Sequence, residues 1–304
     1  MNYMNMLNNC NLCIRNCGVN RLKGETGTCN STDKVKASKA YLHMWEEPPI
    51  SLDTGSGTVF FSNCNFRCVF CQNHEISQEN KGAFISNLEL SNIFLNLQAK
   101  GANNINLVTP THYVPQIIEA LKIAKSNGLT IPILYNTNGY DSLDTIKALD
   151  GYIDVYLPDF KYYDDKYAIK YSKAPGYREN VINILKEMYK QVGKNKFDEK
   201  GRMTKGLIIR HLMLPGLLFD SKKVIDTIYS LFGDNVYISI MNQYTPMNKS
   251  CDYPEINKPL NPKHYESLID YAASLGVKNA FIQESGTNSK AYVPSFKYEG
   301  VMKK

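Results

Sequence analysis

The stretch FFSNCNFRCVFCQN at residues 60–73 decides the fold of this chain. It begins inside a short apolar run with the residue types of a buried strand, and Cys64, Cys68 and Cys71 follow at C-x3-C-x2-C spacing. Three thiolates on one loop reach three corners of an iron–sulfur cube. Because full cysteine ligation takes four thiolates, one iron stays open for a substrate or cofactor. A zinc loop completed by a distant residue such as His74 is the alternative, but zinc prefers closely spaced ligand pairs from two loops.

Short apolar runs alternate with amphipathic helical patterns from residue 57 onward. Helix starts are marked by capping-box spacing at Ser86 and Glu89 and by prolines in the first turns of other runs. Strand–helix alternation repeated about six times predicts parallel strands with right-handed crossovers, in a partial barrel or a doubly wound sheet. In either architecture the site lies at the carboxyl ends of the strands. The expected strands are 58–62, 105–109, 131–136, 153–157, 206–212, 236–241 and 279–283. The expected helical runs are 90–97, 114–121, 220–232 and 262–272.

The first fifty residues differ from the rest because they are dense in Cys, Asn and Gly and lack a clear period. Cys10, Cys13, Cys17 and Cys29 stand at C-x2-C-x3-C-x11-C, enough to enclose zinc or a second iron–sulfur cluster. A structural knuckle is favoured over a cluster that relays electrons or anchors substrate, because closed four-cysteine sites are more often structural. The expected regions are a cysteine-rich metal-binding module (1–50), a barrel (51–290) and a C-terminal tail (291–304).

Composition sets the class of protein. With 43% hydrophobic residues, 21% charged residues and a formal net charge of +6, the 304-residue chain has an ordinary globular composition. There is no secretory signal and no apolar run of about 18 residues, so we expect a cytoplasmic protein without a membrane span. In that reducing compartment eight cysteines indicate metal rather than disulfides. The modest charge and the lack of a basic aromatic platform argue against a nucleic-acid partner.

The cysteine spacing, with the aromatic Phe70 just before the last cysteine, resembles the radical S-adenosylmethionine (SAM) superfamily. Within it the chain is similar to pyruvate formate-lyase activating enzymes and their uncharacterised relatives. The resemblance runs from about residue 57 to residue 284. It implies a partial (β/α)6-type barrel and a [4Fe–4S] cluster whose open iron binds the amino and carboxylate groups of SAM. It further implies reductive cleavage of SAM to a 5′-deoxyadenosyl radical that abstracts hydrogen, an oxidoreductase activity, an electron donor such as flavodoxin or ferredoxin, and a substrate that could be a partner protein.

Later matches occur in order at predicted strand ends. Thr-Asn-Gly with Asn138 at its centre, Asp159-Phe-Lys161, and Arg210 upstream of a Pro-Gly pair all resemble segments of activating enzymes. The resemblance implies that these residues lie at SAM, with Arg210 facing the methionine carboxylate. Together with Phe70 they form the expected cofactor-binding set.

Two segments depart from the activating enzymes. Many members carry Gly-Gly-Glu after the second strand, whereas residues 108–112 read VTPTH here, so Thr109, Thr111 or His112 is expected to receive the amino group of SAM. Where activating enzymes place a His after the sixth strand, this chain has Gln243 as the nearest polar residue. These changes leave the cofactor chemistry in place and the substrate open.

A second hypothesis is an iron–sulfur electron carrier or scaffold without radical chemistry. Such a protein has no need for Asp159, Lys161 and Arg210 beside its cluster, which favours the radical enzyme. Two other features are expected to be structural. Residues 46–49, Glu-Glu-Pro-Pro, could serve the site but are more typical of a polar linker turn, and Cys251 stands alone as an incidental thiol.

Overall fold

The computed structural model describes residues 3–283 and 296–301, which are built on one large β-sheet. Its strands are β1 (Val35–His43), β2 (Ser56–Phe61), β3 (Ala83–Ile85), β4 (Ile105–Val108), β5 (Ile133–Thr137), β6 (Val155–Pro158), β7 (Lys196–Phe197), β8 (Met203–Leu212), β9 (Tyr237–Met241) and β10 (Ala280–Ile282). The order across the sheet is β10-β9-β8-β6-β5-β4-β2-β1-β3, with β7 paired to β8. From β2 to β10 along this order every pairing is parallel, so all seven predicted strands are present and parallel. The order does not close on itself within the described residues, as predicted for a partial barrel.

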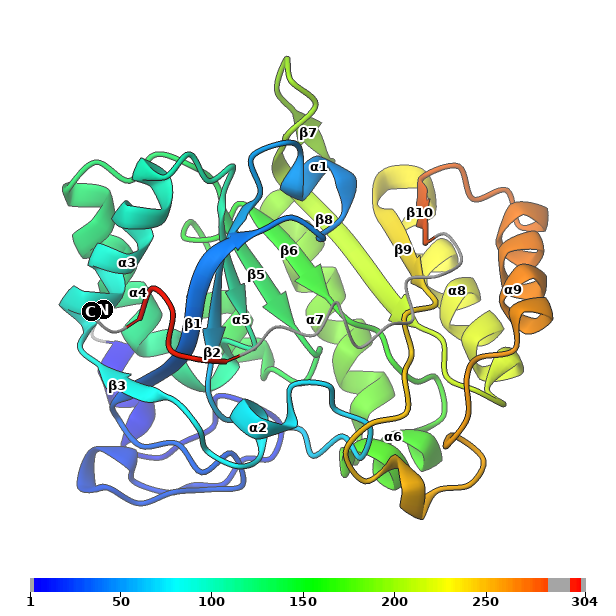
Figure 1. Ribbon diagram of the computed structural model, residues 1–304, viewed down its shortest axis with the longest axis horizontal. Helices are drawn as coiled ribbons and strands as arrows, with labels where there is room; N and C mark the ends of the chain where they lie inside the picture. The colour runs from blue at the N-terminus through cyan, green and yellow to red at the C-terminus, as the bar shows by residue number, and fades with distance from the viewer. Residues whose placement is uncertain (1–2, 284–295, 302–304) are drawn as a thin grey trace.

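Helices follow the parallel strands and pack on the outer face of the sheet (Figure 1). The helices of the described residues are α1 (Pro48–Ser51), α2 (His74–Ser77), α3 (Asn87–Ala99), α4 (Val114–Ser126), α5 (Leu143–Ala148), α6 (Asp165–Ser172), α7 (Tyr177–Val192), α8 (Leu218–Phe232) and α9 (Pro262–Ser274). Two short helices are exceptions to this packing: α1 precedes β2, and α2 lies within the cysteine loop. Short 3₁₀ helices are η1 (Tyr3–Leu7), η2 (Arg21–Lys23), η3 (Thr111–Tyr113), η4 (Gly233–Asn235) and η5 (Ser250–Asp252). The four predicted helical runs are confirmed as α3, α4, α8 and α9. Among the described residues no helix is both long and apolar enough to cross a membrane.

Local sequence explains these elements. Every residue of β5 is buried, as expected for a strand covered on both faces. Helix α3 begins with the predicted capping box. Ser86 Oγ accepts the Glu89 backbone N–H at 3.2 Å, and the Glu89 carboxylate accepts the Ser86 N–H at 2.7 Å. Two backbone donors of the first helical turn are thereby satisfied.

Strand β1 was not among the predicted strands. It lies within the first fifty residues yet pairs antiparallel with β2 and β3, which joins it to the main sheet. Its Ala40 N–H also donates to Glu299 O at 2.8 Å, so the described C-terminal residues 296–301 lie along the same strand. The predicted C-terminal tail, 291–304, otherwise falls outside the described residues. The proposed boundaries at residues 50 and 290 stay predictions.

Each face of the sheet is covered by its own cluster of buried apolar residues. The large core lies between the strands and the helices, and a smaller cluster fills the inner face. The smaller cluster contains Ile50 of α1 together with Leu134, Leu157 and Ile208 from three parallel strands. In Figure 1, α1 lies at the amino ends of these strands, opposite α2 and α6. The barrel interior is therefore packed at one end, and its functional groups lie at the other.

Candidate active site

The cysteine loop leaves β2 and carries three thiols at the carboxyl end of the sheet. Each sulfur has a hydrogen-bonding neighbour. The contacts join Cys64 to the Phe66 N–H (3.3 Å) and Asn138 Nδ2 (3.4 Å), Cys68 to Ser172 Oγ (3.1 Å), and Cys71 to Ser77 Oγ (3.3 Å). Donors aimed at sulfur stabilise metal-bound thiolates and tune iron–sulfur clusters. Burial raises the pKa of Cys64 to about 12 and that of Cys68 to about 11, so bound iron is needed to hold them as thiolates.

The spacing of the thiols suits a cluster better than a single ion. Across residues 3–283 and 296–301, no three His, Cys, Asp or Glu side chains are placed to hold one metal ion together. In an iron–sulfur cube each thiolate binds a different iron, so its ligands stand further apart than those of zinc. The three thiols therefore fit a [4Fe–4S] cluster, in which each thiolate binds its own iron, better than a single ion.

The Thr-Asn-Gly turn after β5 braces this loop. Asn138 Nδ2 donates to Asn65 Oδ1 at 2.7 Å as well as to Cys64, so its amide is directed at the cysteine loop. Gly139 has a φ of +80°, and a Cβ there would lie 2.6 Å from Asp159 O. Only glycine allows this close approach of β5 and β6 without strain. The motif expected at SAM thus contacts the cysteine loop at Cys64 and Asn65.

An ion-pair network lies beside the thiols. Asp159 follows β6 and Arg210 belongs to β8, and the two residues form a parallel bridge. Asp159 Oδ1 accepts from Arg210 Nε and Nη2, each at 3.0 Å, and its Oδ2 lies 2.7 Å from Lys161 Nζ. All three side chains are largely buried, with exposures of 12–15%. The order of strands β6 and β8 in the sheet thus brings the three predicted residues together.

Glu46 joins this network, which corrects the prediction of a polar linker turn. Its Oε2 lies 3.5 Å from Arg210 Nη1, and its Oε1 accepts from Asn106 Nδ2 at 2.9 Å. Arg210 Nη2 also donates to Asn136 Oδ1 at 2.5 Å. Residues from β4, β5, β6 and β8 therefore form one polar layer above the small apolar cluster.

Burial and charge act against each other in this layer. Burial alone would raise the pKa of Asp159, but Lys161 and Arg210 together hold it below its ordinary value. Burial raises the pKa of Glu46 even though Arg210 and Asn106 oppose that shift. For Lys161, burial lowers the pKa, and the negative charge of Asp159 reverses the shift, leaving it raised. Asp159, Lys161 and Arg210 are therefore all charged at neutral pH.

The network opens into a cavity of about 190 Å³ that also contains two of the thiols. Its lining includes most of the residues expected at the first cluster and at SAM. These are Cys68, Phe70, Cys71, Asp159, Lys161, Arg210 and Gln243. Phe70 packs edge-on against Tyr244, with ring centroids 5.6 Å apart, and Gln243 Oε1 lies 3.5 Å from Gln283 Nε2. Charged groups, an aromatic ring and cluster ligands thus share one cavity, as a combined cluster and cofactor site requires.

The VTPTH segment behaves differently from expectation. Thr109 has a φ of +57°, which is rare for a β-branched residue and marks backbone strain at the end of β4. Thr109 is not among the residues that line the cavity. His112 faces the other way: its Nε2 lies 2.8 Å from Ser62 O, and its ring lines a cavity formed by the N-terminal cysteines. The expectation that His112 could receive SAM is therefore wrong.

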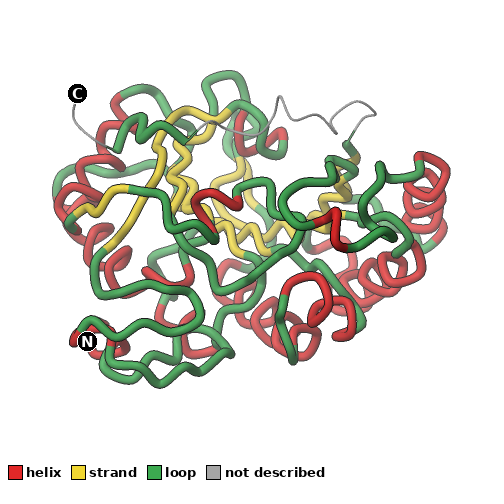
Figure 2. Tube along the Cα trace, turned by 60° about the horizontal axis from the view of Figure 1, so that its bottom comes forward, coloured by secondary structure: helices red, strands yellow, loops and turns green. Residues whose placement is uncertain are grey.

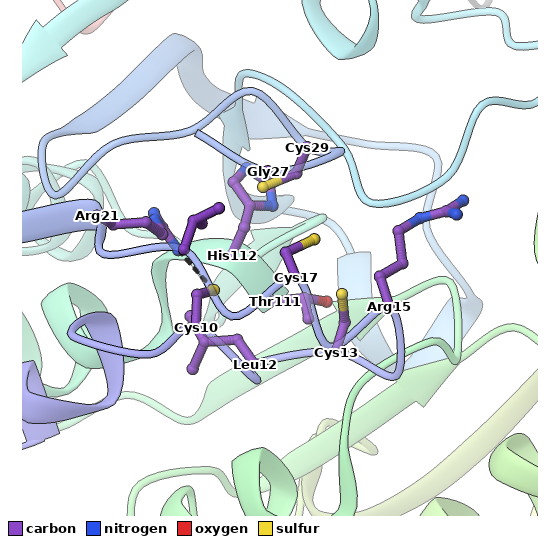
Figure 3. Close-up of a pocket in the computed structure, with 11 residues that line it drawn as sticks. Cys10, Leu12, Cys13, Arg15, Cys17, Arg21, Gly27, Cys29, Thr111 and His112 are labelled. Carbon is purple, nitrogen blue, oxygen red and sulfur yellow. Dashed lines mark hydrogen bonds between the residues drawn. The ribbon is translucent and has the colours of Figure 1, made fainter. Parts of the chain in front are cut away.

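The four N-terminal cysteines line that second cavity together (Figure 3). The segment is docked beside the cysteine loop: Arg15 Nε donates to Asn65 O at 2.7 Å, and the Ser142 N–H donates to Leu12 O at 3.1 Å. The tube trace in Figure 2 shows the N-terminal segment as loops beside the main sheet. A segment with few regular elements therefore brings four distant cysteines to one place.

A parallel α/β barrel with three loop thiols and a buried Arg–Asp–Lys network at its carboxyl end is the architecture of an enzyme that uses an iron–sulfur cluster. The family model described as "Radical SAM superfamily" matches residues 58–228, more than half of the chain. The chain belongs to the radical SAM superfamily, and membership implies a [4Fe–4S] cluster and SAM. The uncharacterized protein MJ0674 of Methanocaldococcus jannaschii is 31% identical over 277 residues, which cover 88% of this chain and 75% of that protein.

Solved structures share the fold at low identity. Streptococcus suis SuiB bound to SAM superposes with a TM-score of 0.53 at 16% identity, over 74% of this chain and 49% of that chain. The FeFe-hydrogenase maturase HydG from Carboxydothermus hydrogenoformans gives 0.52 at 13% identity, over 77% of this chain and 55% of that chain. This chain thus spans about half the length of these neighbours, and the likeness shows the radical SAM fold.

Proposed function

We propose that this enzyme cleaves SAM reductively at a [4Fe–4S] cluster on Cys64, Cys68 and Cys71. We further propose that it is an oxidoreductase of the activating-enzyme type acting on a polypeptide. The observation that carries the proposal is the cavity in which Cys68 and Cys71 face the buried pair of Arg210 and Asp159. A simple electron carrier has no use for this polar layer, because burying unneeded charges is costly.

The charges in the cavity match those of SAM, which carries a carboxylate, an ammonium and a sulfonium. Arg210 and Lys161 offer buried cations to the carboxylate. Asp159 supplies negative charge for the ammonium and sulfonium groups. In the structure each cation already contacts Asp159, so SAM meets a network whose geometry is fixed before binding.

The cluster, when bound, supplies one electron that cleaves the sulfonium to methionine and a 5′-deoxyadenosyl radical, which removes a hydrogen atom from substrate. The residues of the chain position the reactants and exclude water. Phe70 and Tyr244 cover one side of the cavity with apolar surface, and Gln243 presents an amide at its rim. Asn138 holds Cys64 and Asn65 in place through its side-chain amide.

Two structural features support a polypeptide substrate. Ile50 and its neighbours pack the amino end of the barrel, so substrate reaches the radical from the carboxyl end. That end carries the cavity in which Cys68 and Cys71 lie. SuiB, which shares the fold, has been crystallised with the precursor peptide SuiA. We propose that this enzyme likewise takes a peptide segment, with a backbone glycine as the first candidate for hydrogen abstraction.

The proposal also names partners. The formal net charge of +6 favours an acidic one-electron donor such as flavodoxin or ferredoxin, in the reducing cytoplasm. A second metal centre at Cys10, Cys13, Cys17 and Cys29, zinc or iron–sulfur, completes the proposed cofactor set.

SAM cleavage by the reconstituted protein tests the central claim. The protein is loaded anaerobically with iron and sulfide, reduced with dithionite and mixed with SAM, and 5′-deoxyadenosine is quantified. We expect 5′-deoxyadenosine from the wild type. The Arg210→Lys variant should lose about 10- to 100-fold in kcat/KM, because one charged hydrogen bond is worth about 1.5–3 kcal/mol and lysine cannot reproduce the arginine contacts.

Arg202→Lys is the matched control. Arg202 also pairs with an aspartate, Asp198, at 2.9 Å, but on the β7–β8 turn outside the cavity. This variant should keep wild-type cleavage. An intact, verified cluster that yields no 5′-deoxyadenosine would leave the carrier hypothesis as the better one. To test the substrate class, 5′-deoxyadenosine formed with glycine-deuterated polypeptides is examined for deuterium, and its absence across such polypeptides would point to a small molecule.

A further inference from the structure

The N-terminal cavity has the features of a metal site that the radical chemistry does not explain. Cys10, Cys13, Cys17 and Cys29 line it, with apolar contributions from Leu12 and Val19 among others. Gly27 allows the chain to close around it, since a Cβ at this position would lie 2.6 Å from Cys17 Sγ. Figure 3 shows the four sulfurs arranged around this space. The cysteines come from separate turns of a segment that has little core of its own.

A buried cation, Arg21, lines the cavity and is stable there only with negative charge nearby. Arg21 is fully buried, and within the described residues it forms no ion pair with a carboxylate. Its guanidinium donates to Thr32 O, and Nη1 lies 3.9 Å from Cys10 Sγ. A buried guanidinium without a counter-charge is strongly unfavourable. Neutral thiols supply no charge, whereas four metal-bound thiolates carry a net negative charge that offsets the cation.

His112 is a second, independent indication of a ligand. The ring is 3% exposed, and Nε2 donates to Ser62 O, which fixes Nδ1 as an unprotonated acceptor. That Nδ1 is buried without a hydrogen-bonding partner among the described residues. A histidine that donates one ring N–H to a carbonyl and leaves the other nitrogen free has the arrangement commonly found at metal sites.

The spacing of the sulfurs distinguishes a cluster from zinc. Zinc holds four thiolates at about 2.3 Å, which draws the sulfurs together around one point. The N-terminal thiols are not gathered in this way, since no group within the described residues is placed to hold one ion. The same is true of Cys64, Cys68 and Cys71, which the family assigns to a [4Fe–4S] cluster. The two thiol sets therefore share one property, that neither is placed to hold a single ion, and this favours a cluster, whose thiolates bind separate irons, over zinc.

The second cavity is coupled to the first cysteine loop by hydrogen bonds on both sides of Cys64. Asn63 Nδ2 donates to Ser31 Oγ at 3.1 Å and to Asn30 O at 3.2 Å, directly after Cys29. On the other side, Arg15, between Cys13 and Cys17, donates to Asn65 O at 2.7 Å. Ordering the N-terminal site thus fixes the loop that carries the radical-forming cluster.

We propose that Cys10, Cys13, Cys17 and Cys29 bind a second [4Fe–4S] cluster, with Arg21 neutralising its thiolates and His112 facing it. This inference goes beyond the proposed function, since SAM cleavage needs only the first cluster. Metal content of the full chain tests it. After anaerobic reconstitution we expect about eight irons and eight sulfides per wild-type chain, because each cubane contributes about four of each.

Two variants assign the iron to its sites. The Cys64→Ala/Cys68→Ala/Cys71→Ala variant should keep about four irons and four sulfides, and the reduced protein should retain an electron paramagnetic resonance signal. Cys13→Ser/Cys17→Ser should also keep about four irons, now at the first site. Cys251→Ser is the matched control, since this thiol is exposed and lies in neither cavity, and it should match the wild type.

Several outcomes would overturn the inference. One is about four irons in the wild type with none left in the triple variant. Another is about one zinc and no sulfide in the triple variant, which would assign a structural zinc site. If the triple variant does not fold, the iron lost in Cys13→Ser/Cys17→Ser relative to wild type decides the question. Failure of SAM cleavage with eight irons present would reject the proposed function and leave this inference standing.

Discussion

Asp159 is the residue on which the polar layer depends, and Asp159→Asn tests that dependence. Its carboxylate contacts Lys161 Nζ at 2.7 Å and Arg210 at 3.0 Å, and its side chain is only 12% exposed. Removing one partner of a buried ion pair destabilises a protein by about 3–5 kcal/mol. We expect the lower end, about 3 kcal/mol, because Glu46 and Asn136 still accept hydrogen bonds from the Arg210 guanidinium.

Urea unfolding of the metal-free chain, followed by circular dichroism, measures this effect without any contribution from lost iron. With a slope of about 3 kcal/mol per molar urea, the midpoint should fall by about 1 M. Glu119→Gln is the control, because Glu119 pairs with Lys122 on the surface of α4, where such a pair is worth less than about 1 kcal/mol. Equal midpoints for the two variants would refute the account of the polar layer.

The pH dependence provides a second check on the same variant. The folded pKa of Asp159 lies below its ordinary value, so its ion pairs stabilise the folded state above the unfolded pKa of about 3.9. This stability is lost as pH falls through the lowered folded pKa. The difference between wild type and Asp159→Asn should therefore be full at neutral pH and shrink in acid below about pH 4. A difference that stays constant with pH would indicate lost packing rather than lost charge.

Three further predictions concern other parts of the chain. Ser86→Ala should lower the free energy of unfolding by about 1 kcal/mol through loss of the α3 cap, measured by the same urea titration, and an unchanged midpoint would contradict it. Gly139→Ala should destabilise the protein by more than about 1 kcal/mol and lower its iron occupancy, because the residue has a φ of +80° and an added Cβ would meet Asp159 O. Normal iron content in this variant would argue that the Thr-Asn-Gly turn does not support the cysteine loop. Burial lowers the pKa of His211 to about 4, so the unfolded chain takes up this proton first, near pH 6.5, and stability falls between about pH 6.5 and 4. His211→Asn should flatten that slope in urea titrations across pH, and an unchanged slope would assign it to other groups.

The alternating pattern was sufficient to predict the parallel part of the fold, because buried strands and amphipathic helices each leave a local signature. Strand β1 escaped prediction because Lys36 and Lys39 break the apolar pattern, although both are buried in the structure. Their long aliphatic stems pack along the sheet while the amines reach polar partners: Lys36 Nζ contacts the Asn80 side chain at 3.0 Å. Such a strand resembles a surface segment in sequence alone.

The candidate site was predictable where one loop or one strand end carries the chemistry. Cys68, Cys71, Asp159, Lys161 and Arg210 were all expected, and they line a single cavity.

Glu46 was missed because its partner, Arg210, lies 164 residues away, and only the packing of α1 beneath the strands brings them together. The cavity that His112 faces was not predicted, for a related reason. The turn at Thr109, with its positive φ, decides which way the following 3₁₀ helix faces, and the residue types of VTPTH do not reveal that direction.

The docking of the N-terminal segment has a consequence for the order in which the protein is made. Cys10 to Cys29 are synthesised well before the surfaces that they bind. Arg15 bonds Lys173 O across 158 residues, and the Ser142 N–H bonds Leu12 O. Closing such long loops is entropically unfavourable until contacts with the folded barrel offset the cost. These four thiols therefore remain exposed until those later segments have been made, and we expect metal to enter that cavity only after the barrel has folded.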